Sequence, residues 1–118
     1  MIDLNNIMEK YKILKEVVMN IFEIEKLPDI KENEIIDILK ETENIKIERI
    51  ISTGQISDWM VQEKKEYVVL VQGTAIIEFN DKKVEMKAGD TLFIDKMVRH
   101  RVAYTSQNPY CIWFCIHF

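Results

Sequence analysis

The sequence lacks the features of secreted, membrane-spanning and nucleic-acid-binding proteins. Its 118 residues include only two cysteines, too few for the disulfide framework of a small secreted domain. No apolar run approaches the roughly 20 residues of a membrane-spanning helix, and the first residues lack the cationic and apolar regions of a signal peptide. The formal net charge of −4 argues against a basic surface for DNA or RNA. We therefore expect a cytoplasmic protein with no nucleic-acid partner and no membrane partner.

The two cysteines, Cys111 and Cys115, are poorly spaced for a disulfide. On one strand, four residues at roughly 3.3 Å each separate them by about 13 Å, whereas the Cα atoms of a disulfide lie within about 7 Å. We expect two buried thiols in a reducing compartment, with a metal-binding pair as the alternative.

Glycine and proline are also scarce, with three and two residues, yet Gly, Asn and Asp divide the middle of the chain regularly. Short runs of β-branched and aromatic residues between such turn residues are typical of antiparallel strands. These runs cover residues 67–71, 74–79, 83–86 and 91–94, and a fifth opens at residue 99. Further strands are predicted at 20–24, 45–53 and 110–118, while residues 32–40 fit either a strand or two turns of helix. The pattern predicts an all-β sandwich or barrel.

Only the beginning of the chain has a clear helical period. Between residues 3 and 18, apolar side chains recur at three- and four-residue steps, and Asp3 is a suitable N-cap. The apolar positions are Leu4, Ile7, Met8, Tyr11, Leu14 and Val18. We therefore divide the chain into an N-terminal amphipathic helix extension, residues 1–19, and a β domain, residues 20–118. The helix would dock either on the β domain or on a partner chain.

The spacing of a further set of residues resembles the two sequence motifs of small single-domain cupins. The resemblance is to a little-characterised subgroup of bacterial cupins. The first motif has a Gly, two His, a Glu and a second Gly, and the second has a Gly, a Pro, a Gly and a His. The corresponding residues here are Gly54, Met60, Gln62, Glu66 and Gly73, then Gly89, Asp95, Met97 and His100. The resemblance implies a jelly-roll, or double-stranded β-helix, barrel that forms a homodimer. Two of the four usual metal-ligand positions, Glu66 and His100, keep the residue type of the family.

In such a barrel Gln62, Glu66 and His100 would converge on one pocket. These donors can hold a divalent ion such as Mn, Fe, Ni or Zn, but the two missing histidines favour a hydrogen-bonded polar cluster without a metal. His117 would add a second imidazole if it faces inward. Both faces of the last strand are apolar, so the sequence does not say which face lines the pocket. We favour the alternative in which His117 lies at the strand end near solvent.

The remaining predicted pocket residues are Met60, Tyr104, Trp59 and Tyr67. Met60 shares a strand face with Gln62, and Tyr104 shares one with His100, by the two-residue period. Trp59 and Tyr67 would wall the entrance. We expect a module that binds a small polar molecule in the barrel. The alternatives are a metal-dependent oxygenase or isomerase acting on a small carboxylic acid or sugar, and an interaction protein acting through the N-terminal helix.

Overall fold

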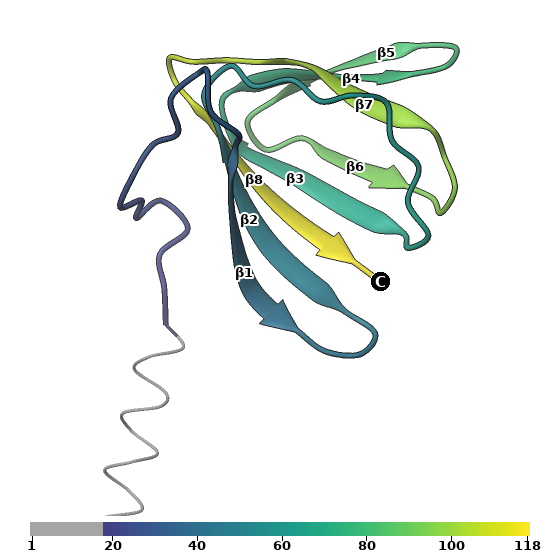
Figure 1. The fold of residues 1–118 in the computed structure, drawn as a ribbon, viewed down its shortest axis with the longest axis horizontal. Helices are drawn as coiled ribbons and strands as arrows, with labels where there is room; N and C mark the ends of the chain where they lie inside the picture. The colour runs from purple at the N-terminus through teal and green to yellow at the C-terminus, as the bar shows by residue number, and fades with distance from the viewer. Residues whose placement is uncertain (1–17) are drawn as a thin grey trace, which may run out of the picture.

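The computed structural model describes residues 18–118, which form two antiparallel β-sheets facing each other (Figure 1). The larger sheet has the strand order β1-β2-β8-β3-β6 and the smaller has β5-β4-β7. The strands are β1 Ile35–Glu41, β2 Lys46–Ser52, β3 Glu66–Gln72, β4 Thr74–Phe79, β5 Lys83–Lys87, β6 Thr91–Ile94, β7 His100–Thr105 and β8 Cys111–His117. Within this range there is no helix, and hence none long and apolar enough to cross a membrane. The all-β prediction is confirmed.

Most of the predicted strands are present, with two differences at the beginning of the domain. The ambiguous segment 32–40 becomes strand β1 from Ile35 onward. The strand predicted at residues 20–24 is wrong, because this segment forms a turn. There the Asn20 side chain accepts a hydrogen bond from the amide of Phe22 at 2.8 Å, and its carbonyl accepts one from Glu23 at 3.0 Å. The helix predicted at 3–18, except for Val18, lies outside the described residues.

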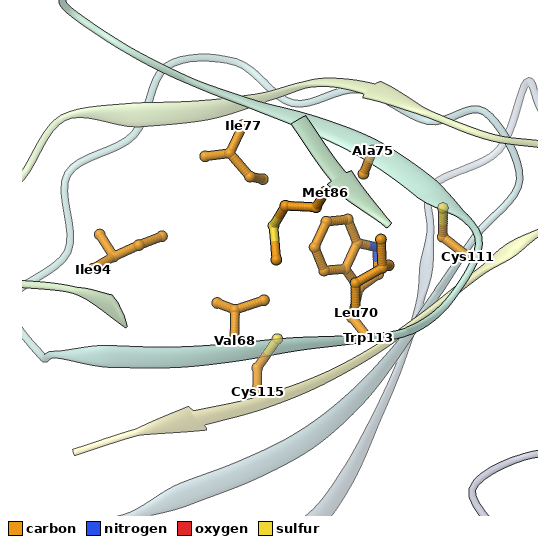
Figure 2. Packing of buried hydrophobic residues seen from close by; sticks show 9 residues of the cluster. All are labelled: Val68, Leu70, Ala75, Ile77, Met86, Ile94, Cys111, Trp113 and Cys115. Atoms are coloured by element: carbon orange, nitrogen blue, oxygen red, sulfur yellow. The ribbon is translucent and has the colours of Figure 1, made fainter. Parts of the chain in front are cut away.

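The hydrophobic core lies between the two sheets and includes both cysteines (Figure 2). Trp113 of β8 and Leu70 of β3, on the larger sheet, face Met86 of β5 and Ala75 of β4. Cys111 and Cys115 are free thiols and are 0% and 2% exposed, as the sequence predicts. The core therefore fills the space between the sheets next to the cavity described below.

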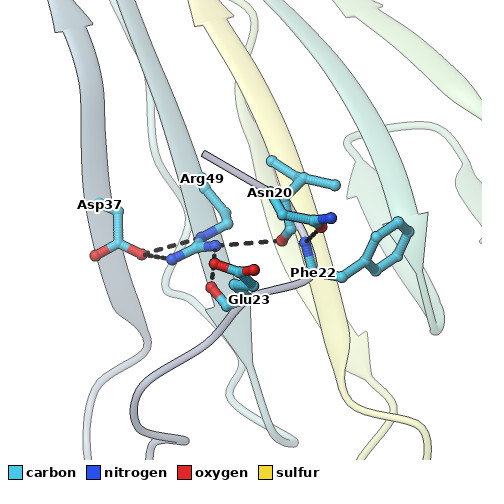
Figure 3. Close-up of polar contacts among 6 residues, drawn as sticks. Asn20, Phe22, Glu23, Asp37 and Arg49 are labelled. Atoms are coloured by element: carbon cyan, nitrogen blue, oxygen red, sulfur yellow. Dashed lines mark hydrogen bonds and ion pairs between the residues drawn. The ribbon is translucent and has the colours of Figure 1, made fainter. Parts of the chain in front are cut away.

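Arg49 attaches the segment before β1 to the outer side of the larger sheet (Figure 3). Its Nε and Nη2 atoms donate to Asp37 Oδ2 at 3.0 and 2.7 Å. Its Nη1 atom donates to the carbonyls of Ile21 and Glu23 at 3.2 and 2.7 Å. Arg49 is only 7% exposed, so these four bonds satisfy most of a nearly buried guanidinium. A turn held by side-chain contacts therefore stands where a strand was predicted.

We expect the substitution Arg49→Met to release residues 20–24 from the sheet. The loss of charge-assisted bonds should lower the free energy of unfolding by about 1.5 kcal/mol, and should speed hydrogen exchange at the Phe22 and Glu23 amides. Hydrogen exchange followed by mass spectrometry, with urea unfolding, checks both. Arg101→Met is the control, because within residues 18–118 the hydrogen bonds of the Arg101 side chain go to the Glu78 carboxylate, at 2.9 Å, and to no backbone carbonyl. Equal exchange rates in the two variants would contradict this role of Arg49.

Candidate functional site

A cavity of about 280 Å³ opens between the sheets beside the core. Strands β1, β2, β3 and β8 line one side of it, and β4, β7 and the segment 57–62 line the other. Its apolar lining consists of Ile36, Ile50, Met60, Val68, Ile77, Ile94, Val102 and Trp113. Its polar lining consists of Glu34, Lys46, Glu48, Ser57, Gln62, Glu66, His100, Cys115 and His117. The cavity is therefore apolar toward the core and strongly polar elsewhere.

Strand alternation and register bring the ionisable groups together. On β2, β3 and β8 every second side chain faces the cavity. Glu66 of β3 lies opposite His117 of β8, and Cys115 of β8 lies opposite Glu48 of β2. Since these three strands are neighbours in the sheet, residues far apart in the sequence meet on one surface.

Glu48 and His117 form a buried pair. The Nε2 atom of His117 lies 2.6 Å from Oε1 of Glu48, and the two residues are 8% and 5% exposed. The hydrogen bond from His117 lowers the pKa of the Glu48 carboxyl, against the opposing effect of burial. The prediction that His117 lies near solvent is wrong, because the cavity-facing side of β8 carries it inward. Glu48 was missed, because a carboxylate on a half-buried strand usually faces water.

Glu66 and His100 form a second, looser pair across the cavity. Oε2 of Glu66 lies 3.9 Å from Nε2 of His100. Nδ1 of His100 lies 2.9 Å from the carbonyl of Val98. A carbonyl only accepts hydrogen bonds, so Nδ1 carries a proton and Nε2 is the ring nitrogen that faces Glu66. Burial raises the pKa of the Glu66 carboxyl, and the His117 and His100 charges oppose that rise.

Two further polar groups complete the cavity. Nε2 of Gln62 lies 3.8 Å from the Met60 sulfur, while its Oε1 is buried and has no hydrogen-bond partner among the described residues. Oε2 of Glu34 accepts a bond from the Ser52 hydroxyl at 3.3 Å. Burial raises the pKa of Glu34, and the charges of Glu48 and Glu66 raise it further. Glu34 precedes β1 in an irregular segment, so no periodicity marks it as a pocket residue.

Three predicted pocket residues do not line the cavity. Tyr67 follows inward-facing Glu66, so alternation turns it outward, where it is 40% exposed. Tyr104 is 47% exposed, because the register of β7 with β4 slips by one residue at Ala103 and reverses its side. Trp59 packs instead against two guanidinium groups, those of Arg99 and Arg101, whose carbons lie 4.0 and 4.9 Å from its ring centroid. The entrance is therefore not walled by these aromatic residues.

The donors present do not fit a resident divalent ion. At the two histidine positions of the first motif stand Met60 and Gln62, a thioether and a neutral amide, which bind Mn, Fe, Ni or Zn weakly. Within residues 18–118, no group of three His, Cys, Asp or Glu side chains is arranged to hold a metal. Glu48 and His117 are bonded to each other. The absence of a bound metal stays a prediction, tested below.

The comparisons with known proteins agree with this architecture. A family model described as Cupin domain matches residues 48–117, which is more than half of the chain. The chain therefore belongs to the cupin family. No curated protein matches the sequence.

Three solved structures illustrate the similarity. A Ralstonia eutropha JMP134 protein, provisionally assigned as a mannose-6-phosphate isomerase, is 35% identical with a TM-score of 0.76, covering 85% of this chain and 95% of its own. A cupin superfamily protein of Desulfitobacterium hafniense DCB-2 is 15% identical with a TM-score of 0.68, covering 78% and 83%. A cupin-2 domain protein of Shewanella frigidimarina NCIMB 400 is 17% identical with a TM-score of 0.59, covering 98% and 92%. At such low identity the last two show the fold alone.

Proposed function

We propose that this cupin binds a small polar organic molecule in the cavity between its sheets, and that it does so without a resident metal ion. The observation that carries the proposal is the cavity itself, into which Gln62, Glu66 and His100 turn polar atoms from three different segments. A volume of about 280 Å³ is at the small end of ligand sites. The buried Gln62 oxygen without a partner supports the proposal, because a ligand hydroxyl or amine would satisfy it.

A second candidate is isomerisation of a sugar by proton transfer. It is favoured by the assignment of the Ralstonia eutropha relative and by the carboxylate–imidazole pair of Glu66 and His100. A sugar phosphate suits the cavity poorly, because among the described residues the only Lys or Arg in its lining is Lys46, whose Nζ lies 3.9 Å from Glu48 Oε2. An unphosphorylated sugar fits the lining better.

The homodimer and the partner-binding helix remain separate proposals, which gel filtration of the full chain and of residues 18–118 would test.

To test ligand binding, we would fill the cavity and measure what the protein retains. The substitution Val102→Trp should abolish retention of the small molecule, because Val102 lines the cavity. The measurement is mass spectrometry of metabolites released on denaturing the purified protein. Val61→Trp is the matched control, since Val61 is 50% exposed and lies outside the lining. A metabolite retained equally by both variants, or none retained by the wild type, would contradict the proposal.

To test the absence of metal, we would measure metal content by plasma mass spectrometry on untagged protein. We expect less than about one tenth of an equivalent of Mn, Fe, Ni or Zn, even after incubation with each, because within residues 18–118 no three His, Cys, Asp or Glu side chains are arranged to hold an ion. His100→Ala should leave the low content unchanged. Near-stoichiometric metal in the wild type, lost in His100→Ala, would instead favour the metal-dependent enzyme.

A further inference from the structure

The cavity lining has an excess of negative charge. In the part of the chain that the structure describes, three carboxylates, those of Glu34, Glu48 and Glu66, face the cavity, and no arginine does. Lys46 is the one lysine that residues 18–118 contribute to the lining, and its side chain is 37% exposed. A buried carboxylate without a cationic partner is costly. The cavity therefore favours a ligand that brings positive charge with it.

The three carboxylates are not compensated equally. Glu48 accepts a close hydrogen bond from His117, and the ammonium group of Lys46 lies 3.9 Å from its Oε2 atom. Among the described residues, the one side-chain donor to Glu34 is the neutral Ser52 hydroxyl, at 3.3 Å. Glu66 is 8% exposed and lies 3.9 Å from the nearest imidazole nitrogen, beyond hydrogen-bond length. Among residues 18–118, Glu34 and Glu66 are thus the two of these carboxylates with no cationic group within hydrogen-bond distance.

The uncharged polar atoms of the lining act in the same direction. Oε1 of Gln62 is a buried acceptor with no partner among the described residues. With Nδ1 of His100 donating to the Val98 carbonyl, Nε2 of the neutral form of this ring is another acceptor. With the carboxylates, these atoms make a lining of hydrogen-bond acceptors. A protonated primary amine supplies three donors and one positive charge in a small volume, and so matches this lining.

We propose that the ligand of this cavity is a small organic cation carrying a protonated amine, held by Glu66 and Glu34, with Gln62 and His100 accepting its remaining donors. This inference rests on the proposed function, since it names the chemical class of the bound molecule. A carboxylic acid would meet like charge in the cavity and is disfavoured. A metal ion would find no three His, Cys, Asp or Glu side chains arranged to hold it within residues 18–118.

The test uses three probes that differ only at one end: 4-amino-1-butanol, 1,4-butanediol and 4-hydroxybutyrate. At pH 7 these end groups carry one positive charge, none and one negative charge. Binding to the full chain is followed by two-dimensional NMR, through the Trp113 indole signal beside the cavity. We expect the amine to bind at least about tenfold tighter than the diol, because of its attraction to the carboxylates, and the acid to bind weakest.

Two isosteric variants show whether the carboxylates cause the preference. Glu66→Gln and Glu34→Gln should each weaken amine binding about tenfold and leave diol binding within about threefold. Glu43→Gln is the matched control, since Glu43 is exposed in the turn between β1 and β2. It should change neither affinity.

The outcomes separate this inference from the proposed function. Equal binding of amine and diol, or amine binding unchanged in Glu66→Gln and Glu34→Gln, overturns the cationic ligand and leaves the binding cavity standing. Binding of none of the probes also overturns it, and the retained-metabolite experiment then decides the proposed function by itself. Tight binding of Mn²⁺ or Zn²⁺ alone, lost in Glu66→Gln, would assign the positive charge to a metal and overturn the amine.

Discussion

Replacing Gly73 by alanine is expected to lower the free energy of unfolding by about 3 to 4 kcal/mol, from positive-φ strain and overpacking together. Gly73 joins β3 to β4 with φ +93°, a conformation that L side chains rarely adopt. An added Cβ would lie 2.7 Å from the Cys111 sulfur and 2.8 Å from the Ser106 hydroxyl. It would also lie 3.0 Å from the Cα of Cys111, which is backbone and cannot rotate away. Urea unfolding followed by tryptophan fluorescence measures the change.

Gly89 provides the control for Gly73, because it separates backbone strain from steric overlap. Its φ is also +93°, but an added Cβ there would meet no atom within 4 Å. Gly89→Ala should therefore cost about 1 kcal/mol, the strain alone. A loss of stability for Gly73→Ala no larger than that for Gly89→Ala would contradict the close packing of the β3–β4 turn against Cys111.

Glu48→Gln and Glu66→Gln are expected to change stability in opposite directions at pH 7 to 8. Glu48→Gln removes the charge from a buried bond to His117 and should cost about 2 kcal/mol. Glu66→Gln removes a buried carboxylate whose ionisation the fold disfavours, and should stabilise the protein by about 1 kcal/mol. The two variants keep side-chain shape, so their difference reports the charges. Urea unfolding across a pH series measures both.

The pH dependence of the two variants follows from the direction of each pKa shift. The folded pKa of Glu48 lies below its unfolded value of 4.5, so its stabilisation is present above pH 4.5 and is lost as pH falls through the folded pKa. The folded pKa of Glu66 lies above 4.5, so the wild type loses stability as pH rises from 4.5 through that pKa. The gain from Glu66→Gln should therefore vanish below about pH 4.5, whereas the cost of Glu48→Gln should vanish only below the folded pKa of Glu48.

A gain in stability from Glu66→Gln would also bear on function. A carboxylate that destabilises the folded protein, yet faces the cavity, is characteristic of a residue kept for binding. Glu85→Gln, on β5 and exposed, is the control and should change stability by less than about 0.5 kcal/mol. Equal effects of Glu48→Gln and Glu66→Gln, in sign and size, would contradict the different environments of the two carboxylates.

The motif spacing determined part of the site directly. Gln62, Glu66 and His100 could be placed in one pocket from the sequence, because the resemblance to cupins fixes which strands carry them. The same resemblance places Met97 where the family has Gly, and Met97 indeed has φ +63°. A turn that needs a left-handed residue keeps that conformation even when a side chain is present. The strand pattern likewise followed from turn residues and β-branched runs.

Side-chain orientation on strands that are apolar on both faces could not be predicted. On β8, Trp113, Cys115 and His117 alternate with residues as apolar as themselves, so periodicity does not say which set faces the cavity. Only the register of β8 between β2 and β3 decides it. The same register pairs His117 with Glu48, a residue that looks like an ordinary surface carboxylate in the sequence.

Local irregularities account for the other differences. The bulge at Ala103 places the Tyr104 side chain on the outer face of β7. The hydrogen bonds from Arg49 to the carbonyls of Ile21 and Glu23 hold residues 20–24 in a turn in place of the predicted strand. The sequence by itself determined the all-β fold, because strand-forming runs and turn residues are local properties, and its resemblance to the cupin motifs implied that Glu66 and His100 share a pocket. Only the tertiary structure decided that Glu34, Glu48 and His117 join them, because an acidic cavity arises from contacts between strands far apart in the chain.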